Sequence, residues 1–304
     1  MKHLFCPIIF FFWFLSFSQP KEYTVTNIQL NDEFPHFGLM PLANGEVVLT
    51  TYILDKKGRI EYLQGEPVFG VYRGIIDGAG SIQIINPIKI DSKQNKPHII
   101  SASISPDGAS IYITVRYTNK NKPKGDFNMN NFHIEVGEYK QGLGWTNFKV
   151  LPFCKPRYSY AHPSLSKDGK TLYFTANLRG GKETTKGGSD IFKVDILENN
   201  TYSEPENLGS NVNSYSREMF PVIANDNTLY FASNRPGGYG GYDIYKSTMG
   251  KTGMFAKAEK LSKPLNSIKD DFSLITFDGC ESGFLSSKRP NGKGDDDIYY
   301  FTKN

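Results

Sequence analysis

The residues that could do chemistry in this chain are charged side chains near the predicted starts of short strands. Glu218, Asp270 and Asp271 supply carboxylates, with Arg217 and His162 close by in the repeat pattern. Most glycoside hydrolases use two carboxyl groups that face each other across a pocket, roughly 5–10 Å apart. An acid and base pair is therefore one hypothesis, and a polar lining that binds a ligand is the other. We favour the lining, because Glu218 and Asp270 hold an equivalent position after an Asn-Ser link, where a turn-capping residue is common.

Three other aspartates recur once in each repeated unit. Asp190, Asp243 and Asp297 each stand directly before an isoleucine and an aromatic residue. A residue that returns with the structural unit usually serves the fold, and an aspartate in such a place caps a turn by accepting backbone N–H bonds. We therefore predict a structural role for these three side chains.

The sequence offers no convincing metal or cofactor site. The three consecutive aspartates at 295–297 lack the alternating ligand spacing and the distal glutamate of a calcium loop. His36, His98 and His162 lie near predicted strand starts but out of register with one another. Zinc ligands need a closer and more regular arrangement. We predict neither a metal nor a cofactor.

A second group of candidates lies in predicted loops and links. Tyrosine and arginine are among the residues that most often anchor protein interfaces. One interpretation is therefore a partner-binding surface at the rim of the propeller, and the other is ordinary aromatic packing in turns. An exposed flat aromatic side chain, such as Trp145 or Tyr239, would instead suit glycan binding. The rim candidates are Arg157, Tyr158, Tyr160, Arg235, Tyr239 and Tyr242.

The elements that must position these residues are short strands in a repeated unit. Residues 217–246 read as three strands separated by turns, because runs of aromatic and β-branched residues are bounded by Asn, Asp, Gly and Pro. Residues 162–193 and 271–300 repeat this pattern. A repeat of about 50 residues with four strands per unit is the mark of a β-propeller, in which small sheets pack face to face around an axis.

Five units can be aligned on their second strands, the first two of them degenerate. The last unit lacks an outer strand, whereas residues 23–28 form a predicted strand with no partner of their own. Pairing the two closes the ring and removes two exposed edges. We therefore predict an all-β, five-bladed propeller of four-stranded blades, with six blades as the alternative. The second strands are residues 47–51, 111–115, 172–176, 229–233 and 283–287.

The repeats resemble the WD40-like repeat of the TolB type, also called the Pro-Asp propeller repeat. In the third unit Pro163, Asp168, Gly169 and the run 172–174 match its pattern, followed by Asp190. The fourth unit matches from Pro221 to Ile244, and the first half of the chain matches weakly. The resemblance implies an exported protein linked to the outer membrane of Gram-negative bacteria. It implies a function only loosely, because propellers include both binding proteins and enzymes.

The first residues differ in kind from the repeats. A basic tip, an apolar run of about fourteen residues and small residues at Ser16 and Ser18 are typical of a secretory signal peptide. We predict a signal peptide at residues 1–18, a single propeller domain at 19–304 and no transmembrane span after cleavage. Cys154 and Cys280 would remain in the mature chain, and we favour two isolated thiols over a disulfide.

Composition limits the class of partner. The 304 residues carry a net charge of +4 with dispersed lysines, whereas a nucleic-acid-binding protein usually has a concentrated basic face. We predict a non-enzymatic, exported binding or scaffolding module of the periplasm or outer membrane, with an envelope protein or complex as partner. The alternative is a carbohydrate-active enzyme or glycan-binding protein that uses the mouth of the axial channel.

Overall fold

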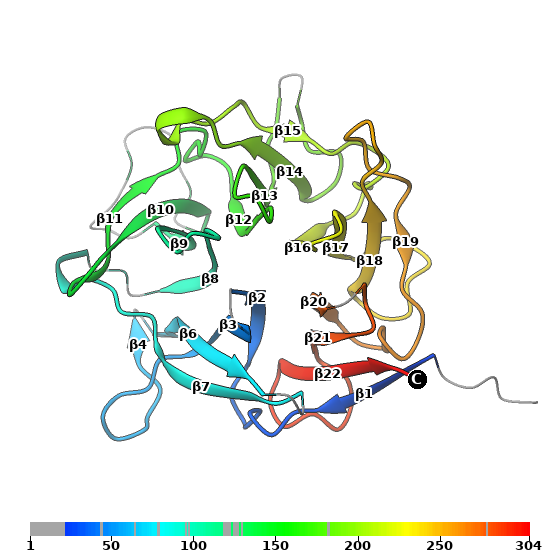
Figure 1. The fold of residues 1–304 in the computed structure, drawn as a ribbon, viewed down its shortest axis with the longest axis horizontal. Coiled ribbons are helices and arrows are strands. Elements are labelled where there is room, and N and C mark those ends of the chain that lie inside the picture. The colour runs from blue at the N-terminus through cyan, green and yellow to red at the C-terminus, as the bar shows by residue number, and fades with distance from the viewer. Residues whose placement is uncertain are drawn as a thin grey trace, which may run out of the picture.

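The computed structural model is a five-bladed β-propeller, which confirms the predicted fold (Figure 1). It describes residues 22–304 except 43–44, 64, 78–79, 95, 97, 118–122, 124–127, 129, 181–182 and 278. The predicted signal peptide lies outside the described residues. Within them, no helix has the length and apolar character needed to cross a membrane.

Each blade is a four-stranded antiparallel sheet, with its first strand at the propeller axis and its last at the outside (Figure 1). Blade 1 contains β2 (Phe37–Pro41), β3 (Glu46–Tyr52), β6 (Phe69–Ile76) and β7 (Ile82–Pro87), with a small added hairpin of β4 (Tyr62–Leu63) and β5 (Glu66–Pro67). Blade 2 contains β8 (Ile99–Ile104), β9 (Ser110–Arg116), β10 (Phe132–Lys140) and β11 (Gly144–Val150).

The next two blades have short outer strands. Blade 3 contains β12 (Tyr160–Leu165), β13 (Thr171–Ala176), β14 (Asp190–Asp195) and β15 (Glu206–Asn207). Blade 4 contains β16 (Glu218–Ile223), β17 (Thr228–Ser233), β18 (Asp243–Thr248) and β19 (Glu259–Lys260). Single turns of 3-10 helix at Ser92–Gln94 and Glu198–Asn200 lie in links.

Blade 5 joins the two ends of the chain. It contains β20 (Asp271–Phe277), β21 (Ser282–Ser287), β22 (Asp297–Lys303) and, as its outer strand, β1 (Tyr23–Asn27). The register runs from Tyr23 opposite Lys303 to Asn27 opposite Tyr299. The predicted closure of the ring by the N-terminal strand is therefore confirmed.

The core lies between neighbouring blades and is built from the second strands. Their central residues are 0–1% exposed. Fully burying a side chain of this size contributes roughly 1.5–3 kcal/mol. Because each strand is covered on both faces, it reads as a nearly continuous apolar run instead of an alternating one. These central residues are Leu49, Ile113, Phe174, Phe231 and Leu285.

Each first strand carries a β-bulge near the axis. His162, Phe220 and Ser273 have positive φ angles of 55°, 50° and 52° at these bulges. A bulge bends the strand and re-aims its side chains. In blade 5 this position is taken by Ser273, one residue after Phe272.

Candidate functional site

The recurring aspartates cap turns, as predicted. Asp190 accepts N–H bonds from Lys186 at 2.9 Å and Gly187 at 3.3 Å. Asp243 does the same for Tyr239 at 2.8 Å and Gly240 at 3.2 Å. Asp297 accepts bonds from the N–H groups of residues 293 and 294. Their carboxylates are therefore committed to the fold and are 0–1% exposed.

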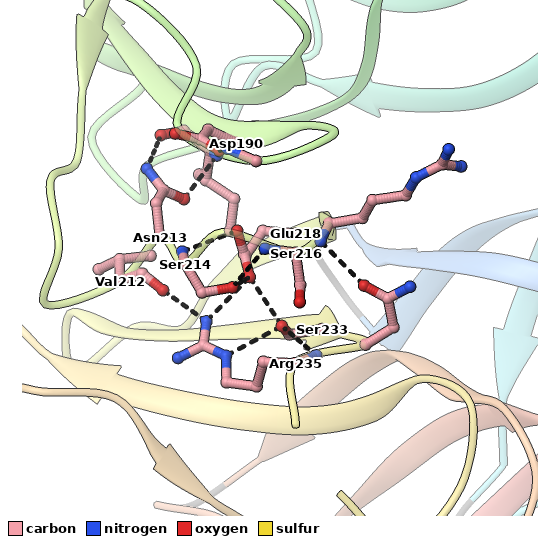
Figure 2. Close-up of polar contacts among 12 residues, drawn as sticks. Asp190, Val212, Asn213, Ser214, Ser216, Glu218, Ser233 and Arg235 are labelled. Atoms are coloured by element: carbon pink, nitrogen blue, oxygen red, sulfur yellow. Dashed lines mark hydrogen bonds and ion pairs between the residues drawn. The ribbon is translucent and has the colours of Figure 1, made fainter. Parts of the chain in front are cut away.

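Glu218 is also committed, although it was a leading candidate for chemistry. Its carboxylate is fully buried and accepts bonds from Ser214 Oγ at 2.6 Å and Ser233 Oγ at 2.7 Å (Figure 2). Arg235 Nη2 lies 3.1 Å from the same carboxylate and also donates to the carbonyl of Val212 at 2.6 Å. A carboxylate with this many partners and no exposure cannot meet a substrate.

Asp271 repeats this arrangement one blade later. It accepts bonds from Ser267 N and Ser287 Oγ, each at 2.5 Å, and from Arg289 Nη2 at 2.8 Å. Burial raises the pKa of Asp271, and Arg289 opposes that shift. Asp271, and not Asp270, is thus the equivalent of Glu218, which corrects the predicted alignment.

Several polar side chains lie at the end of the axis where the first strands begin. We call this group the polar mouth: Arg217, Tyr242, Asp270, Lys288 and Asp296. Asp270 accepts the N–H of Tyr242 at 2.9 Å, and its carbonyl accepts the N–H of Lys288 at 2.9 Å. The ammonium of Lys288 lies 3.7 Å from Asp296, whose side chain is 14% exposed. Burial raises the pKa of Asp296 to about 6; Lys288 opposes this shift, and the nearby acidic groups, Asp270 among them, add to it.

His162 lies deeper along the axis than the polar mouth. Its ring stacks on Phe220 with centroids 3.8 Å apart, and Nδ1 accepts the Phe220 N–H at 3.5 Å. Burial lowers the pKa of His162 to about 3, so the imidazole is neutral. Phe220 also contacts Phe272 at 4.8 Å and Phe37 at 6.4 Å. We call Phe37, His162, Phe220 and Phe272 the aromatic plug.

The predicted rim residues do not form one surface. Tyr160 is fully buried and its OH accepts the Lys155 N–H at 3.1 Å, while Arg235 is held by Glu218. Both were wrong as rim candidates, because each completes a buried polar group.

The remaining rim candidates lie in separate loops and links. The guanidinium of Arg157 lies over Tyr158, 5.3 Å from its ring centroid. Tyr239 is 41% exposed, yet the ammonium of Lys260 lies 3.6 Å from its ring centroid. Tyr242 belongs to the polar mouth.

A cavity of about 780 Å³ opens at the opposite end of the axis, where the first strands end. We call it the axial pocket. Each first strand contributes at least two residues to its wall, and the polar and aromatic side chains around it include Tyr139, Trp145, Arg73, Glu46, Lys167 and Asn225. The first-strand residues include Met40, Ser103, Ser164, Val222 and Ile275.

Sequence reasoning missed the axial pocket, because it placed the binding residues at the starts of the first strands instead of their ends. The signal that could have found it is the pair of small polar residues Ser103 and Ser164, which stand at apolar positions of two first strands. Trp145, named as an exposed aromatic, is only 6% exposed and packs against Tyr139 with ring centroids 5.2 Å apart.

Metal-binding groups are absent from the part of the chain that the structure describes: no three His, Cys, Asp or Glu side chains there could hold an ion. Cys154 is buried and Cys280 is half-buried, and both thiols are free.

Comparison with known proteins finds the fold but no family. No family model and no curated protein matches the sequence. A thermostable family-43 glycoside hydrolase is 14% identical with a TM-score of 0.53, over 92% of each chain. An α-L-arabinofuranosidase from Lactobacillus brevis is 12% identical with a TM-score of 0.52, over 90% of this chain and 92% of the other.

A TolB structure from Agrobacterium tumefaciens is 15% identical over 88% of this chain and 78% of its own, with a TM-score of 0.48. This likeness is too low to extend the TolB resemblance beyond the propeller fold. The expectation of a non-enzymatic protein is corrected. The glycoside hydrolase and the arabinofuranosidase described above, with TM-scores of 0.53 and 0.52, show that enzymes use this fold. At 12–14% identity the likeness itself shows the fold alone.

Proposed function

We propose that this protein is carbohydrate-active and holds a glycan in the axial pocket. The observation that carries the proposal is the pocket itself, whose volume lies within the roughly 300–1,000 Å³ of small-molecule sites. Sugar rings present apolar C–H faces and hydroxyl edges. The pocket offers matching surfaces, with apolar side chains at its walls and the aromatic pair Tyr139 and Trp145 beside them.

Two serines supply hydrogen-bond donors within the wall. Ser103 Oγ accepts the Leu165 N–H at 3.2 Å, and Ser164 Oγ accepts the Ile223 N–H at 3.3 Å. Neither hydroxyl donates to an acceptor among the residues that the structure describes. A hydroxyl with a fixed acceptor role keeps its own hydrogen for a ligand, so both serines can donate to a sugar oxygen.

Charged groups at the pocket would set the orientation of the sugar. Arg73 forms an ion pair with Glu46, whereas Lys167 is exposed. Among the described lining residues, Glu46 supplies a carboxylate. A glycosidic pair needs two carboxyl groups, so cleavage at the pocket would need a second one from outside this lining.

The test is binding and turnover of a glycan panel that includes arabinose- and xylose-containing oligosaccharides. Tyr139 is 53% exposed, so Tyr139→Ala should fold normally and weaken binding about two- to tenfold through loss of its aromatic face. Tyr215→Ala removes a tyrosine that is 89% exposed and does not line the pocket, so it should bind like the wild type. Absence of both binding and turnover across the panel would reject the proposal.

A second candidate function is glycoside hydrolysis at the polar mouth, favoured by the environment of Asp296. A carboxyl group with a pKa of about 6 stays partly protonated near neutral pH and can act as a general acid. Asp270 would be the second carboxylate. We expect turnover to fall as the pH rises above 6.

The matched variants for this candidate are Asp296→Asn and Asp195→Asn. Asp195 is exposed at the end of β14, so its loss removes the same charge from solvent instead of from a buried place. Turnover of a chromogenic glycoside should drop about a hundredfold in Asp296→Asn and change little in Asp195→Asn. Equal rates in the two variants would eliminate Asp296 as the acid.

We also propose that the chain is exported to the cell envelope and meets its partner there. The support is the apolar run and the small residues Ser16 and Ser18. Mass spectrometry of the protein expressed in a Gram-negative host should find a mature N-terminus near residue 19. A full-length chain in the cytosolic fraction would contradict export.

A further inference from the structure

The aromatic plug has a consequence for the kind of glycan that the axial pocket can hold. Phe37 belongs to blade 1, Phe220 to blade 4 and Phe272 to blade 5. Blade 5 separates blades 1 and 4 on one side of the ring, and blades 2 and 3 separate them on the other. Phe37 and Phe220 are nevertheless in ring contact, with centroids 6.4 Å apart. Side chains of two non-neighbouring blades therefore meet across the axis.

The contacts around this level of the axis extend to the other blades. Phe37 contacts Phe272 at 6.4 Å and Phe69 at 5.4 Å, and Phe69 contacts His98 at 5.6 Å. With His162 stacked on Phe220, rings from blades 1, 3, 4 and 5 and that of His98, which precedes β8, form one connected set. His162 is 5% and Phe272 is 8% exposed, whereas Phe37 and Phe220 are half-buried, so the layer is largely packed ring against ring.

Along the axis, the aromatic plug lies between the polar mouth and the wall of the axial pocket. His162 and Ser164 lie on β12, Phe220 and Val222 on β16, and Phe37 and Met40 on β2, so the same strands supply the plug and then the pocket wall. Because these rings meet across the axis, they block passage from the pocket towards the polar mouth.

We infer that the axial pocket takes the end of a glycan chain and cannot accommodate an internal segment. This inference rests on the proposed function and names its substrate class: the terminal units of an oligosaccharide. A through-channel would let a polymer thread along the axis. With the axis blocked by the plug, an internal segment could only lie across the opening, whereas a chain end can enter the pocket. Each linear glycan chain then has one end that can enter the pocket, whatever the length of the chain.

The experiment is a length series measured with the wild-type protein. Linear arabino-, xylo- and malto-oligosaccharides, from disaccharide to octasaccharide, are titrated by calorimetry at equal molar concentration of chains. End binding predicts a Kd per chain that levels off once the pocket is full, because further units add no new end. Internal binding predicts a Kd per chain that keeps falling as units are added, since each new unit adds a binding frame.

Cyclodextrins provide a control without chain ends if the malto-series binds. They should not bind, although their glucose units and linkages are those of the linear chains. For each series that binds, a continued fall of Kd with length overturns the inference while leaving the glycan-binding function intact. Failure of all three series together with the glycan panel rejects the function itself.

A blocked pocket gives a second readout. Asn225 is exposed and lines the pocket, so Asn225→Trp should fill its opening and reduce binding of the shortest bound oligosaccharide about tenfold. Lys251→Trp adds the same ring at an exposed position outside the pocket and should bind like the wild type. Unchanged binding in Asn225→Trp would overturn the placement of the chain end in this pocket.

Discussion

At the residue scale, the charges that first suggest chemistry are used by the fold. Glu218 and Asp271 each form an ion pair with an arginine near the end of the neighbouring strand. In both cases the arginine stands two residues after a serine that donates to the same carboxylate. A buried ion pair is tolerated when its remaining oxygens and hydrogens find partners, and removing one member leaves an uncompensated charge. Blades 4 and 5 thus contain the same buried, hydrogen-bonded ion pair.

We predict that Arg235→Met destabilises the protein far more than loss of an exposed ion pair. The variant leaves Glu218 buried without its cation, and the free energy of unfolding should fall by about 3–5 kcal/mol. Lys246→Met is the control: Lys246 lies 3.9 Å from Glu259, and both side chains are well exposed. Its cost should stay below about 1 kcal/mol. Urea denaturation of both variants tests this, and similar losses would contradict the buried role of Arg235.

His162 makes the stability depend on pH. Its pKa is about 3 in the folded protein and 6.5 ordinarily, so the unfolded chain binds more protons between these values. Stability is therefore lost as the pH falls from 6.5 towards 3, which gives a positive slope of stability with pH. The lowered pKa values of His36 and His98 act in the same direction, and the raised pKa of Asp296 acts against them.

We predict that His162→Gln reduces this slope without removing it. Glutamine keeps polar atoms in the plug but does not titrate, so the difference in stability between variant and wild type should shrink as the pH falls from 7 to 4.5. Urea midpoints at several pH values measure that difference. A difference that stays constant over the range would show that His162 does not titrate between the two states.

At the element scale, glycine-rich turns let one blade dock against the next. A Cβ on Gly187 would lie 1.9 Å from the carbonyl oxygen of Ser216, and one on Gly240 would lie 2.0 Å from that of Lys269. Each turn is held by its aspartate and rests on the chain that leads into the following first strand. The Gly-Gly-x-Asp pattern therefore encodes contact between blades as well as a turn.

Gly187→Ala should accordingly destabilise the protein by about 2 kcal/mol, because backbone atoms must shift to relieve the overlap. Gly250→Ala is the matched control: its Cβ would meet nothing closer than the Met254 carbonyl at 3.5 Å, so we expect a change within about 0.5 kcal/mol. Thermal unfolding measures this difference as the melting temperatures of the two variants relative to the wild type. Equal melting temperatures would refute the close approach.

Asparagines provide a second link within and between elements. Asn213 bonds both the N–H and the carbonyl of Ile191, at 2.8 and 2.9 Å, and Asn266 bonds those of Ile244 in the same way. Asn31 does so for Ile298, although it lies at the other end of the chain. The N-terminal segment therefore supplies blade 5 with the same side-chain bonds that other blades obtain from their own links.

At the scale of the whole molecule, stability depends on closing the ring. Tyr23 and Ile28 are buried in the contact of the N-terminal segment with blade 5, and each such side chain contributes roughly 1.5–3 kcal/mol. The segment also covers the edge of β22. A chain that begins at residue 33 should therefore lose several kcal/mol and unfold over a lower and broader temperature range.

A synthetic peptide of residues 22–32 should restore part of that stability, because it binds only the folded form of the shortened chain. The melting temperature should rise with peptide concentration, and a scrambled peptide should have no effect. Unchanged stability of the shortened chain would show that the ring holds without its N-terminal strand.

The sequence by itself determined the repeated unit, the blade count, the ring closure and the structural role of Asp190, Asp243 and Asp297. These follow from local patterns: strand-forming runs, turn residues at fixed offsets and an unpaired strand at one end. Each is readable because strand pairing and turn chemistry act between residues close in the sequence or equivalent in the repeat.

Only the tertiary structure decided which groups are free to act. The partners of Glu218 and Asp271 come from neighbouring strands and links, so their burial could not be read from either position alone. The bulges in the first strands re-aim side chains toward the axis, and contact between Phe37 and Phe220 depends on two blades that are not neighbours. The axial pocket is what remains between five strands, because its shape depends on where all of them end together.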